Sequence, residues 1–233
     1  MKKIFTKLTS SLLSFFYPKS CVSCLNALQQ KEEQLCLYCM LHLPETNYHL
    51  FNENPLKNIF SGRVRVENVA SLLFYKKNNQ VQKILHSMKY RGNKYLGEYL
   101  GFYYGEKLAQ QKDYQDIDII IPIPLHEKKL KLRGYNQSEW IAKGLGKGMK
   151  LPYNSEVLIR TEYTGTQTKK NRFNRWENVR EVFAVTDKEI LKDKHILICD
   201  DVLTTGATTE AAIQKLIEIE NVKISVVTLA SVF

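Results

Sequence analysis

The sequence lacks any apolar stretch long enough to cross a bilayer, any internal repeat and any low-complexity tract, which argues against membrane-spanning, repeat and disordered proteins. Acidic residues are in short supply: 24 Asp and Glu stand against 34 Lys and Arg, so the formal net charge is +10. This excess predicts attraction to phosphates, nucleic acids or anionic membrane surfaces. A length of 233 residues with 44% hydrophobic content suits one α/β domain with a small appendage.

The N-terminal segment opens with basic residues and an apolar run, which superficially resembles a signal peptide. Lys7 splits the run, however, and no small-residue cleavage site precedes Pro18. An amphipathic helix is the better interpretation, and we expect it to pack on the main domain, with a membrane surface as the alternative. The residues that would share its apolar face are Phe5, Leu8, Leu12, Phe15 and Phe16.

Four of the five cysteines form two Cys-x₂-Cys pairs separated by eleven residues. They are Cys21, Cys24, Cys36 and Cys39. Such paired knuckles are typical of four thiolates that close a tetrahedron around a structural Zn²⁺, and we expect a small zinc ribbon. The alternative, a pair of disulfides in a secreted protein, fits poorly with the rest of the chain. Cys199 stands alone in an apolar run and is expected to be a core residue.

A second motif begins with the apolar run 196–199, which is typical of a strand buried on both faces. Asp200 and Asp201 follow it, and a threonine-rich turn then leads into a predicted helix. The turn residues are Thr204, Thr205, Gly206, Ala207 and Thr208. Free N–H groups at a helix start bind phosphate, while the two acids suit ribose hydroxyls or Mg²⁺. The alternative is a turn whose polar residues only cap the helix.

Strand and helix patterns alternate through the rest of the chain and predict a parallel sheet flanked by helices. The expected strands cover 66–75, 117–121, 157–159, 182–185, 196–199 and 223–230, and the expected helices include 81–88, 96–103 and 137–149. We divide the chain into the helix and cysteine module at 1–44, a polar linker at 45–62 and the α/β domain at 63–233.

Two basic segments complete the set of candidates. The first follows the strand at 117–121, where the turn contains Leu125, His126, Lys128 and Lys129, and Arg133 after it is a candidate for a lid or a nucleic-acid surface. Because ligands bind at the carboxyl ends of parallel strands, we expect this turn to face the same pocket as Asp200 and to hold pyrophosphate. The second segment suits a lid, a nucleic-acid surface or a packed basic helix, and its residues are Lys169, Lys170, Arg172, Arg175 and Trp176.

The motif at 196–209 resembles the phosphoribosyl pyrophosphate (PRPP) signature of type I phosphoribosyltransferases. Together with the segments at 89–92, 122–126 and 133–137, Thr166-Gln167 and the four cysteines, it makes nearly the whole chain similar to the ComF (ComFC, GntX-like) family. The resemblance implies a type I phosphoribosyltransferase-like fold, with Asp200 and Asp201 at the ribose and its Mg²⁺ and Thr204 to Thr208 at the 5′-phosphate. It also implies a cytoplasmic protein that acts on incoming single-stranded DNA in natural transformation.

Two functional hypotheses follow. The first is a Mg²⁺-dependent phosphoribosyltransferase or PRPP-binding protein, including a nucleobase enzyme of nucleotide metabolism. The second is a non-catalytic accessory protein that binds single-stranded DNA, with the zinc ribbon recruiting a partner such as a helicase. The two hypotheses are compatible, because PRPP could be a substrate or a regulator.

Overall fold

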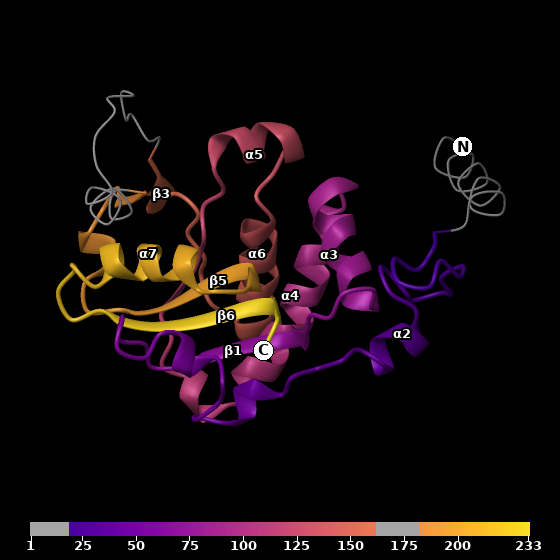
Figure 1. The fold of residues 1–233 in the computed structure, drawn as a ribbon, viewed down its shortest axis with the longest axis horizontal. Helices are drawn as coiled ribbons and strands as arrows, with labels where there is room; N and C mark the ends of the chain where they lie inside the picture. Colours follow the sequence, from indigo (N-terminus) through magenta and orange to yellow (C-terminus); the bar gives the residue numbers. More distant parts are fainter. Residues whose placement is uncertain (1–18, 162–181) are drawn as a thin grey trace, which may run out of the picture.

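A four-stranded parallel sheet forms the centre of the molecule in a computed structural model that describes residues 19–161 and 182–233. Its strands are β1 (Val69–Phe74), β6 (Lys223–Ser231), β5 (His195–Leu203) and β2 (Ile119–Pro122), in that spatial order. Figure 1 shows helices on both sides of this sheet. The structure therefore confirms the parallel α/β sheet flanked by helices.

Alternate residues of each central strand enter two separate cores. In β5, Ile196 and Ile198 pack on one face, whereas Leu197 and Cys199 pack on the other. This alternation is why an unbroken apolar run predicts a strand covered on both sides. Cys199 is fully buried, and its Sγ lies 3.4 Å from the carbonyl oxygen of Ser138. Burial raises the pKa of the Cys199 thiol well above its usual value, which suits a core residue.

The helices divide between these two faces. On one face lie α3 (Gln80–Tyr90), α4 (Lys94–Ala109) and α6 (Gln137–Met149), and on the other lies α7 (Ala207–Leu216). A short helix, α5 (Glu127–Arg133), projects beyond the sheet, and α2 (Leu37–Leu41) belongs to the cysteine module (Figure 1). Single 3₁₀ turns occupy η1 (Tyr48–Leu50), η2 (Lys57–Ile59), η3 (Lys112–Tyr114) and η5 (Glu189–Leu191).

The segment expected to be a linker, 45–62, is packed against the sheet. The N–H of Thr46 donates to Leu72 and that of Phe74 donates to Pro44, so the chain covers the open side of β1. Leu56 and Phe60, which flank η2, are buried in the core between the sheet and α7. The polar composition of this segment did not predict that Leu56 and Phe60 would be buried. The division into 1–44, 45–62 and 63–233 stays a prediction.

Three other features differ from the sequence-based expectations. Strand β5 continues to Leu203, so both acids lie inside the strand, because β6 runs beside it over its full length and supplies partners such as Thr228 for Asp200. Strands β3 (Leu158–Arg160) and β4 (Phe183–Val185) pair antiparallel with each other, outside the main sheet. The basic turn after β2 includes the helix α5, which was not expected.

In the described residues, no helix is long and apolar enough to span a membrane.

Helices α4 and α6 touch backbone to backbone through glycines. A Cβ built at Gly105 of α4 would lie 2.7 Å from the carbonyl oxygen of Leu145 in α6. A Cβ at Gly97, two turns earlier in α4, would meet only side chains, the nearest being the flexible end of Met88 at 3.1 Å. The other side of α6 contacts β2 and β5, and its first turn lies near the end of β5, where Ser138 reaches Asp200.

We predict that Gly105→Ala lowers the free energy of unfolding by about 2 kcal/mol, because the added methyl must push two helix backbones apart. Gly97→Ala is the matched control in the same helix, and we expect a change within about 0.5 kcal/mol, since a higher helix propensity offsets a small shift of Met88. Chemical denaturation of both variants measures the difference. Equal stabilities would show that α4 and α6 do not touch at Gly105.

Candidate functional site

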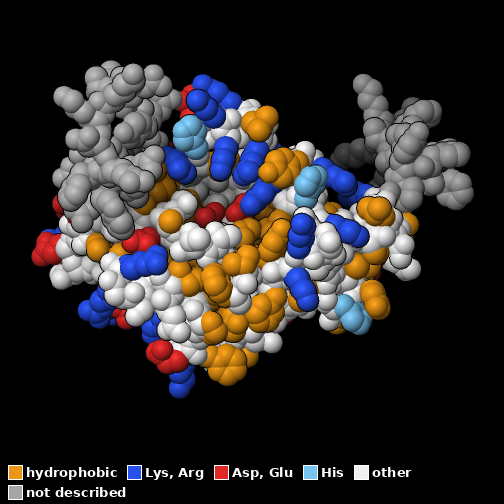
Figure 2. All heavy atoms as spheres, viewed as in Figure 1, with side chains coloured by type: hydrophobic (Ala, Val, Ile, Leu, Met, Phe, Trp, Pro, Cys, Tyr) orange, Lys and Arg blue, Asp and Glu red, His pale blue; other side chains and the backbone are white. Residues whose placement is uncertain are grey.

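A cavity of about 510 Å³ opens at the carboxyl ends of the parallel strands. Its lining includes Ile123 just after β2, Asp200 and Asp201 of β5, Val232 just after β6 and Tyr75 just after β1. Figure 2 shows the hollow with acidic side chains at its floor and Lys and Arg side chains at its rim. Parallel strands place all of these ends at one edge, which is why segments distant in sequence meet here.

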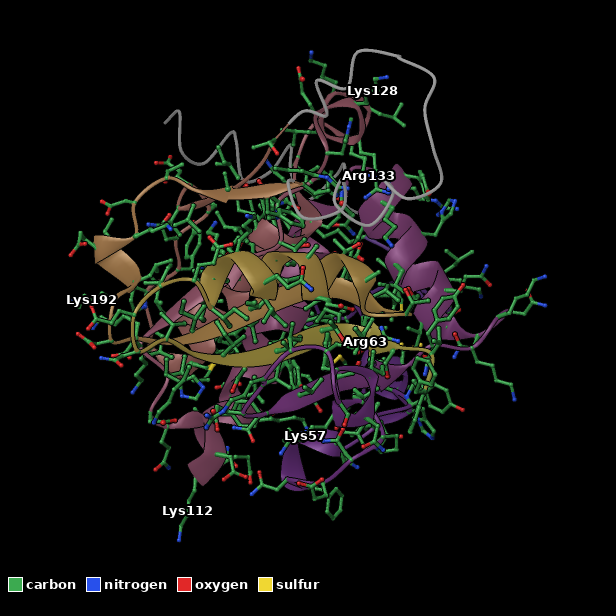
Figure 3. All side chains as sticks on the ribbon, turned by 60° about the vertical axis from the view of Figure 1, so that its left-hand side comes forward. Lys57, Arg63, Lys112, Lys128, Arg133 and Lys192 are labelled. Carbon is green, nitrogen blue, oxygen red and sulfur yellow. The ribbon has the colours of Figure 1, made fainter. Side chains whose placement is uncertain are left out.

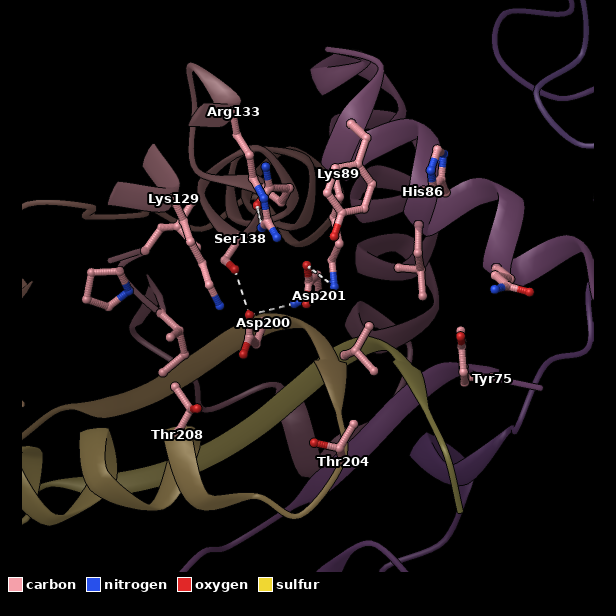
Figure 4. A pocket seen from close by; sticks show the side chains of 18 of the residues that line it. Tyr75, His86, Lys89, Lys129, Arg133, Ser138, Asp200, Asp201, Thr204 and Thr208 are labelled. Carbon is pink, nitrogen blue, oxygen red and sulfur yellow. Dashed lines mark hydrogen bonds and ion pairs between the residues drawn. The ribbon is translucent and has the colours of Figure 1, made fainter. Parts of the chain in front are cut away.

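The two acids at the floor of the cavity have different partners (Figure 4). Asp200 accepts hydrogen bonds at one oxygen, Oδ1, from the Ser138 hydroxyl and from the Asp201 backbone N–H, both at 2.8 Å. Asp201 pairs instead with Lys89 of α3, whose Nζ lies 2.9 Å from Oδ2. The two carboxylates are thus held by three separate segments, namely α6, α3 and β5 itself.

Burial and a neighbouring negative charge act together on Asp200. Loss of solvent is the larger cause and the Asp201 carboxylate the second, and together they raise the pKa of Asp200 to about 7. The Ser138 hydroxyl, the Asp201 N–H and the Lys89 ammonium act in the opposite direction, because they stabilise the ionised form. The site therefore holds one carboxyl group whose ionisation is disfavoured and which gains from a positive ligand.

The backbone conformation of the threonine-rich turn is suited to anion binding. Gly206 adopts φ +77° immediately before α7, and no side chain caps the first turn of that helix. The leading N–H groups of α7 are therefore available to an anion. Thr204 and Thr208 line the cavity and are exposed, as Figure 4 shows. Gly206 also packs tightly, since a Cβ there would lie 2.7 Å from Ile59 Cγ2.

The opposite wall of the cavity is basic. Lys129 and Arg133 of α5 and Arg160 of β3 all line it. Arg133 donates to the Gln137 side chain at 2.6 Å, while its buried Nε has no hydrogen-bond partner within the described residues. Burial lowers the pKa of Arg160, and the Asp200 carboxylate partly opposes that shift. Three cations around two carboxylates leave this end of the cavity suited to a polyanion.

The structure brings together only some of the residues that the sequence analysis selected. Asp200, Asp201, Thr204, Thr208, Leu125, Lys129 and Arg133 line one cavity. His126 and Lys128 do not line the cavity. His126 instead caps α5 by accepting from the Lys128 N–H, and the Lys128 side chain is exposed. Thr205, Gly206 and Ala207 form the backbone of the turn. The second basic segment, with Lys169, Lys170, Arg172, Arg175 and Trp176, and the N-terminal helix lie outside the described residues.

Sequence reasoning missed three polar residues of this site. Lys89 was included only within the segment 89–92 and was given no role, although it pairs with Asp201. Ser138 and Arg160 were not selected at all. Ser138 had one available signal, since it lies two residues after Asn136, whose side chain caps α6 by accepting from the Ser138 N–H. That Ser138 would contact Asp200 depends on the packing of α6 against β5.

The four paired cysteines form a compact cluster away from the cavity. Their sulfur atoms all lie within 4.8 Å of one another, and Cys24 and Cys36 are 3.7 Å apart. Sulfurs bound to one tetrahedral Zn²⁺ have about this separation, because each Zn–S bond is ~2.3 Å. Cys21 and Cys39 are buried, whereas Cys24 is exposed. The donor set and its spacing fit a metal ion held by four thiolates.

Backbone N–H groups prepare one of these thiols for ionisation. Burial opposes the charged form of Cys21, but hydrogen bonds from the N–H groups of Cys24, Cys36 and Ser23 outweigh it and lower its pKa to about 7. Cys39 lacks that support, so burial and the neighbouring thiols raise its pKa to about 12. A positive ion between the sulfurs would stabilise all four thiolates at once.

Comparison with known families identifies the class of this domain: residues 141–233 match the phosphoribosyl transferase domain model. Among curated proteins, the chain is 32% identical over 100 residues to DNA utilization protein YhgH of Escherichia coli O157:H7, covering 43% of each chain. It is 29% identical over 92 residues to competence protein F of Haemophilus influenzae, covering 39% of this chain and 40% of that one. The matches thus span less than half the length of either relative.

These relatives, the matched domain and the cysteine cluster confirm the resemblance to the ComF family that the sequence motifs predicted. Solved structures similar to the chain include adenine phosphoribosyltransferase from Leishmania tarentolae. That match has 14% identity and a TM-score of 0.38 and covers 81% of this chain and 94% of that one. The domain match at 141–233 and the parallel sheet flanked by helices make the fold phosphoribosyltransferase-like, with the four-cysteine cluster beside it.

We predict that Asp200→Asn stabilises the protein at pH 8 and leaves it nearly unchanged at pH 4. The folded state raises the pKa of Asp200 from 3.8 to about 7, so its ionisation is penalised only in the folded protein. Below pH ~4 Asp200 is protonated in both states and does not destabilise the folded wild type. As pH rises through ~7 the buried carboxyl must ionise, and the folded state loses that stability. We expect the variant to melt higher than wild type at pH 8, by about 2–4 °C for each kcal/mol of ionisation penalty removed, measured by thermal denaturation.

The matched control is Glu53→Gln, which neutralises a carboxylate whose side chain is 85% exposed. Its melting temperature should follow that of the wild type at both pH values. A difference between Asp200→Asn and wild type that does not grow with pH would contradict the raised pKa.

Proposed function

We propose that this protein binds PRPP, or a closely related phosphorylated ribose, at the cavity between β2, β5 and α7. The observation that carries the proposal is the meeting of two carboxylates with an uncapped helix start and a basic wall in one hollow. A ribose with phosphates at two positions is complementary to that arrangement. Thr204 to Thr208 would hold the 5′-phosphate, and Leu125, Lys129 and Arg133 would hold the pyrophosphate.

Asp200 and Asp201 would contact the ribose hydroxyls and the Mg²⁺ that accompanies pyrophosphate. Carboxylate oxygens are the ligands that Mg²⁺ prefers in proteins, and it commonly binds through one or two of them together with substrate phosphates. When bound, the ion would neutralise part of the pyrophosphate charge. Ser138 and Lys89 orient the two acids before any ligand arrives, which reduces the ordering that binding requires.

We further propose that the protein acts in natural competence, in the handling of imported single-stranded DNA in the cytoplasm. The names of its relatives, competence protein F and DNA utilization protein, support this role. The net charge of +10 supports attraction to a polyanion. The alternatives are transfer of the pentosyl group to a nucleobase in nucleotide metabolism and a purely DNA-binding accessory role.

The cysteine cluster is proposed to hold one structural Zn²⁺. Zinc binds reduced cysteines, and cysteines stay reduced in the cytoplasm, so a zinc site is consistent with the proposed location. On the same module, Leu37, Tyr38 and Leu41 are 64–73% exposed, which supports contact with a partner protein such as a helicase.

Isothermal titration with PRPP and Mg²⁺ tests the main proposal. Wild type should bind, and the double variant Asp200→Asn with Asp201→Asn should bind about 10–100-fold more weakly, because charge-assisted contacts are lost. The control is Asp193→Asn, just before the amino end of the same strand, and it should bind like wild type. Wild-type protein without measurable binding would overturn the proposal.

Metal analysis of the purified protein tests the zinc site. We expect about one zinc per chain in wild type and a large loss in Cys36→Ser, because one of four ligands is removed. Cys199→Ser is the control, since Cys199 lies in β5 apart from the cluster, and its zinc content should be unchanged. A Cys36→Ser protein with full zinc content would exclude coordination by the four cysteines.

Binding of an oligothymidylate at increasing salt tests the DNA role. Affinity should fall about tenfold or more between ~50 and ~200 mM salt if about three phosphates are contacted. Charge reversal at Lys170, Arg172 and Arg175 should weaken it further. Lys112→Glu with Lys192→Glu is the control, because Figure 3 shows these two lysines away from the α5 end of the molecule, where Lys128 and Arg133 lie. Affinity that does not change with salt would contradict an electrostatic surface.

A further inference from the structure

The four cysteines of the cluster differ in how accessible they are to solvent. Cys21 and Cys39 are buried, Cys36 is half-buried and Cys24 is exposed. The sulfur of Cys24 lies 3.7 Å from that of Cys36, which belongs to the other Cys-x₂-Cys pair. A disulfide needs its two sulfurs at about 2.0 Å, so a small approach of the two side chains would join them. An oxidant in solution therefore meets Cys24 first, with a partner thiol beside it.

The turn that contains Cys24 has a strained backbone. Leu25, the next residue, has φ +68°, a left-handed conformation that is unfavourable for a bulky side chain. Its N–H donates to the Cys21 carbonyl at 2.9 Å and closes the turn. Metal ligation would hold such a turn, because both sulfurs of the pair must point at one ion. Without the ion, the turn would be free to relax.

The cysteine module is also fastened to the helix that forms one wall of the cavity. Lys83 of α3 donates to the carbonyl of Ser23 at 3.1 Å, directly before Cys24. The Ser23 hydroxyl donates to Gln80, at the start of α3, at 3.3 Å. Figure 1 shows the module beside this helix. Lys89 of the same helix pairs with an acid at the floor of the cavity, so a change at Cys24 has a short path to the site.

We propose that Cys24 and Cys36 form a reversible disulfide when the protein meets hydrogen peroxide, and that this modification releases the metal ion and loosens α3. The inference rests on the proposed zinc site, because a cysteine bound to zinc is already a thiolate, the form that attacks an oxidant. Once joined, the two sulfurs no longer serve as ligands, and the remaining two are too few for a structural zinc site. Oxidation at the cluster would thus act on the wall of the cavity.

The reaction balances with peroxide as its one co-reactant. The Cys24 thiolate attacks a peroxide oxygen, so an S–O bond forms, the O–O bond breaks, and the leaving hydroxide takes a proton to give water. The Cys36 thiolate then attacks the Cys24 sulfur, so the S–S bond forms, the S–O bond breaks, and a second water leaves. The two sulfurs lose two electrons, which peroxide gains. A dithiol such as dithiothreitol reverses the change by thiol–disulfide exchange.

Treatment of the zinc-loaded full chain with hydrogen peroxide tests the proposal. A chromogenic chelator measures zinc release, and mass spectrometry of a protease digest identifies the linked peptides. We expect about one zinc released for each Cys24–Cys36 disulfide, and rebinding after dithiothreitol and zinc are added. Cys24→His keeps four ligands without the exposed thiol, so it should release zinc about tenfold more slowly. Cys199→Ser is the control and should release zinc like wild type, because burial keeps Cys199 from the oxidant.

Hydrogen–deuterium exchange tests the effect on α3. After oxidation, the amides of Gln80–Tyr90 should exchange about tenfold faster, because the module that supports this helix is loosened. The amides of Ala207–Leu216 in α7, on the other face of the sheet, should exchange as before. Lys83→Ala removes one link between the module and α3, so oxidation should have a smaller effect in this variant.

The inference is overturned if zinc stays bound while peroxide oxidises the cysteines, if the disulfide joins other cysteines, or if Cys24→His releases zinc at the wild-type rate. Unchanged exchange in α3 after complete zinc release overturns the effect on the cavity. Wild type that contains no zinc overturns the proposed zinc site, and the peptide map alone then decides whether Cys24 and Cys36 pair. The same map decides the pair if Cys24→His binds no zinc.

Discussion

The parallel alignment of four strands is the constraint on which the rest of this structure depends. Because β1, β6, β5 and β2 all run in one direction, their carboxyl ends open at a single edge. The acids of β5, the turn that starts α7 and the basic helix after β2 are brought together only for this reason. An antiparallel arrangement would send half of these groups to the opposite side of the molecule.

The cysteine module and the cavity share one helix. Lys83 of α3 donates to the carbonyl of Ser23 at 3.1 Å, next to the cysteines, and Lys89 of the same helix holds Asp201. The Tyr135 hydroxyl donates to the carbonyl of Met88 and ties this helix to the segment between α5 and α6. Stabilising the cysteine cluster with a metal would therefore also stabilise the wall of the cavity.

Electrostatic balance explains how two carboxylates persist at the floor of the cavity. Lys89, the Ser138 hydroxyl and one backbone N–H support their charge, and Arg160 adds a further cation nearby. The support is incomplete, as the raised pKa of Asp200 shows. A cation between the carboxylates would supply the missing charge, and Lys129 and Arg133 line the same cavity.

The sequence by itself determined what depends on local pattern: the buried strands, the helices at α3, α4 and α6, the two cysteine pairs, and the order of acids, threonines and glycine before α7. These follow from periodicity and spacing, which a linear chain displays directly. Only the tertiary structure decided that Ser138 reaches Asp200, that Lys89 pairs with Asp201, and that segment 45–62 packs along β1. Such contacts depend on how closely elements pack against one another, as Gly105 permits for α4 and α6, and no local sequence pattern specifies that distance.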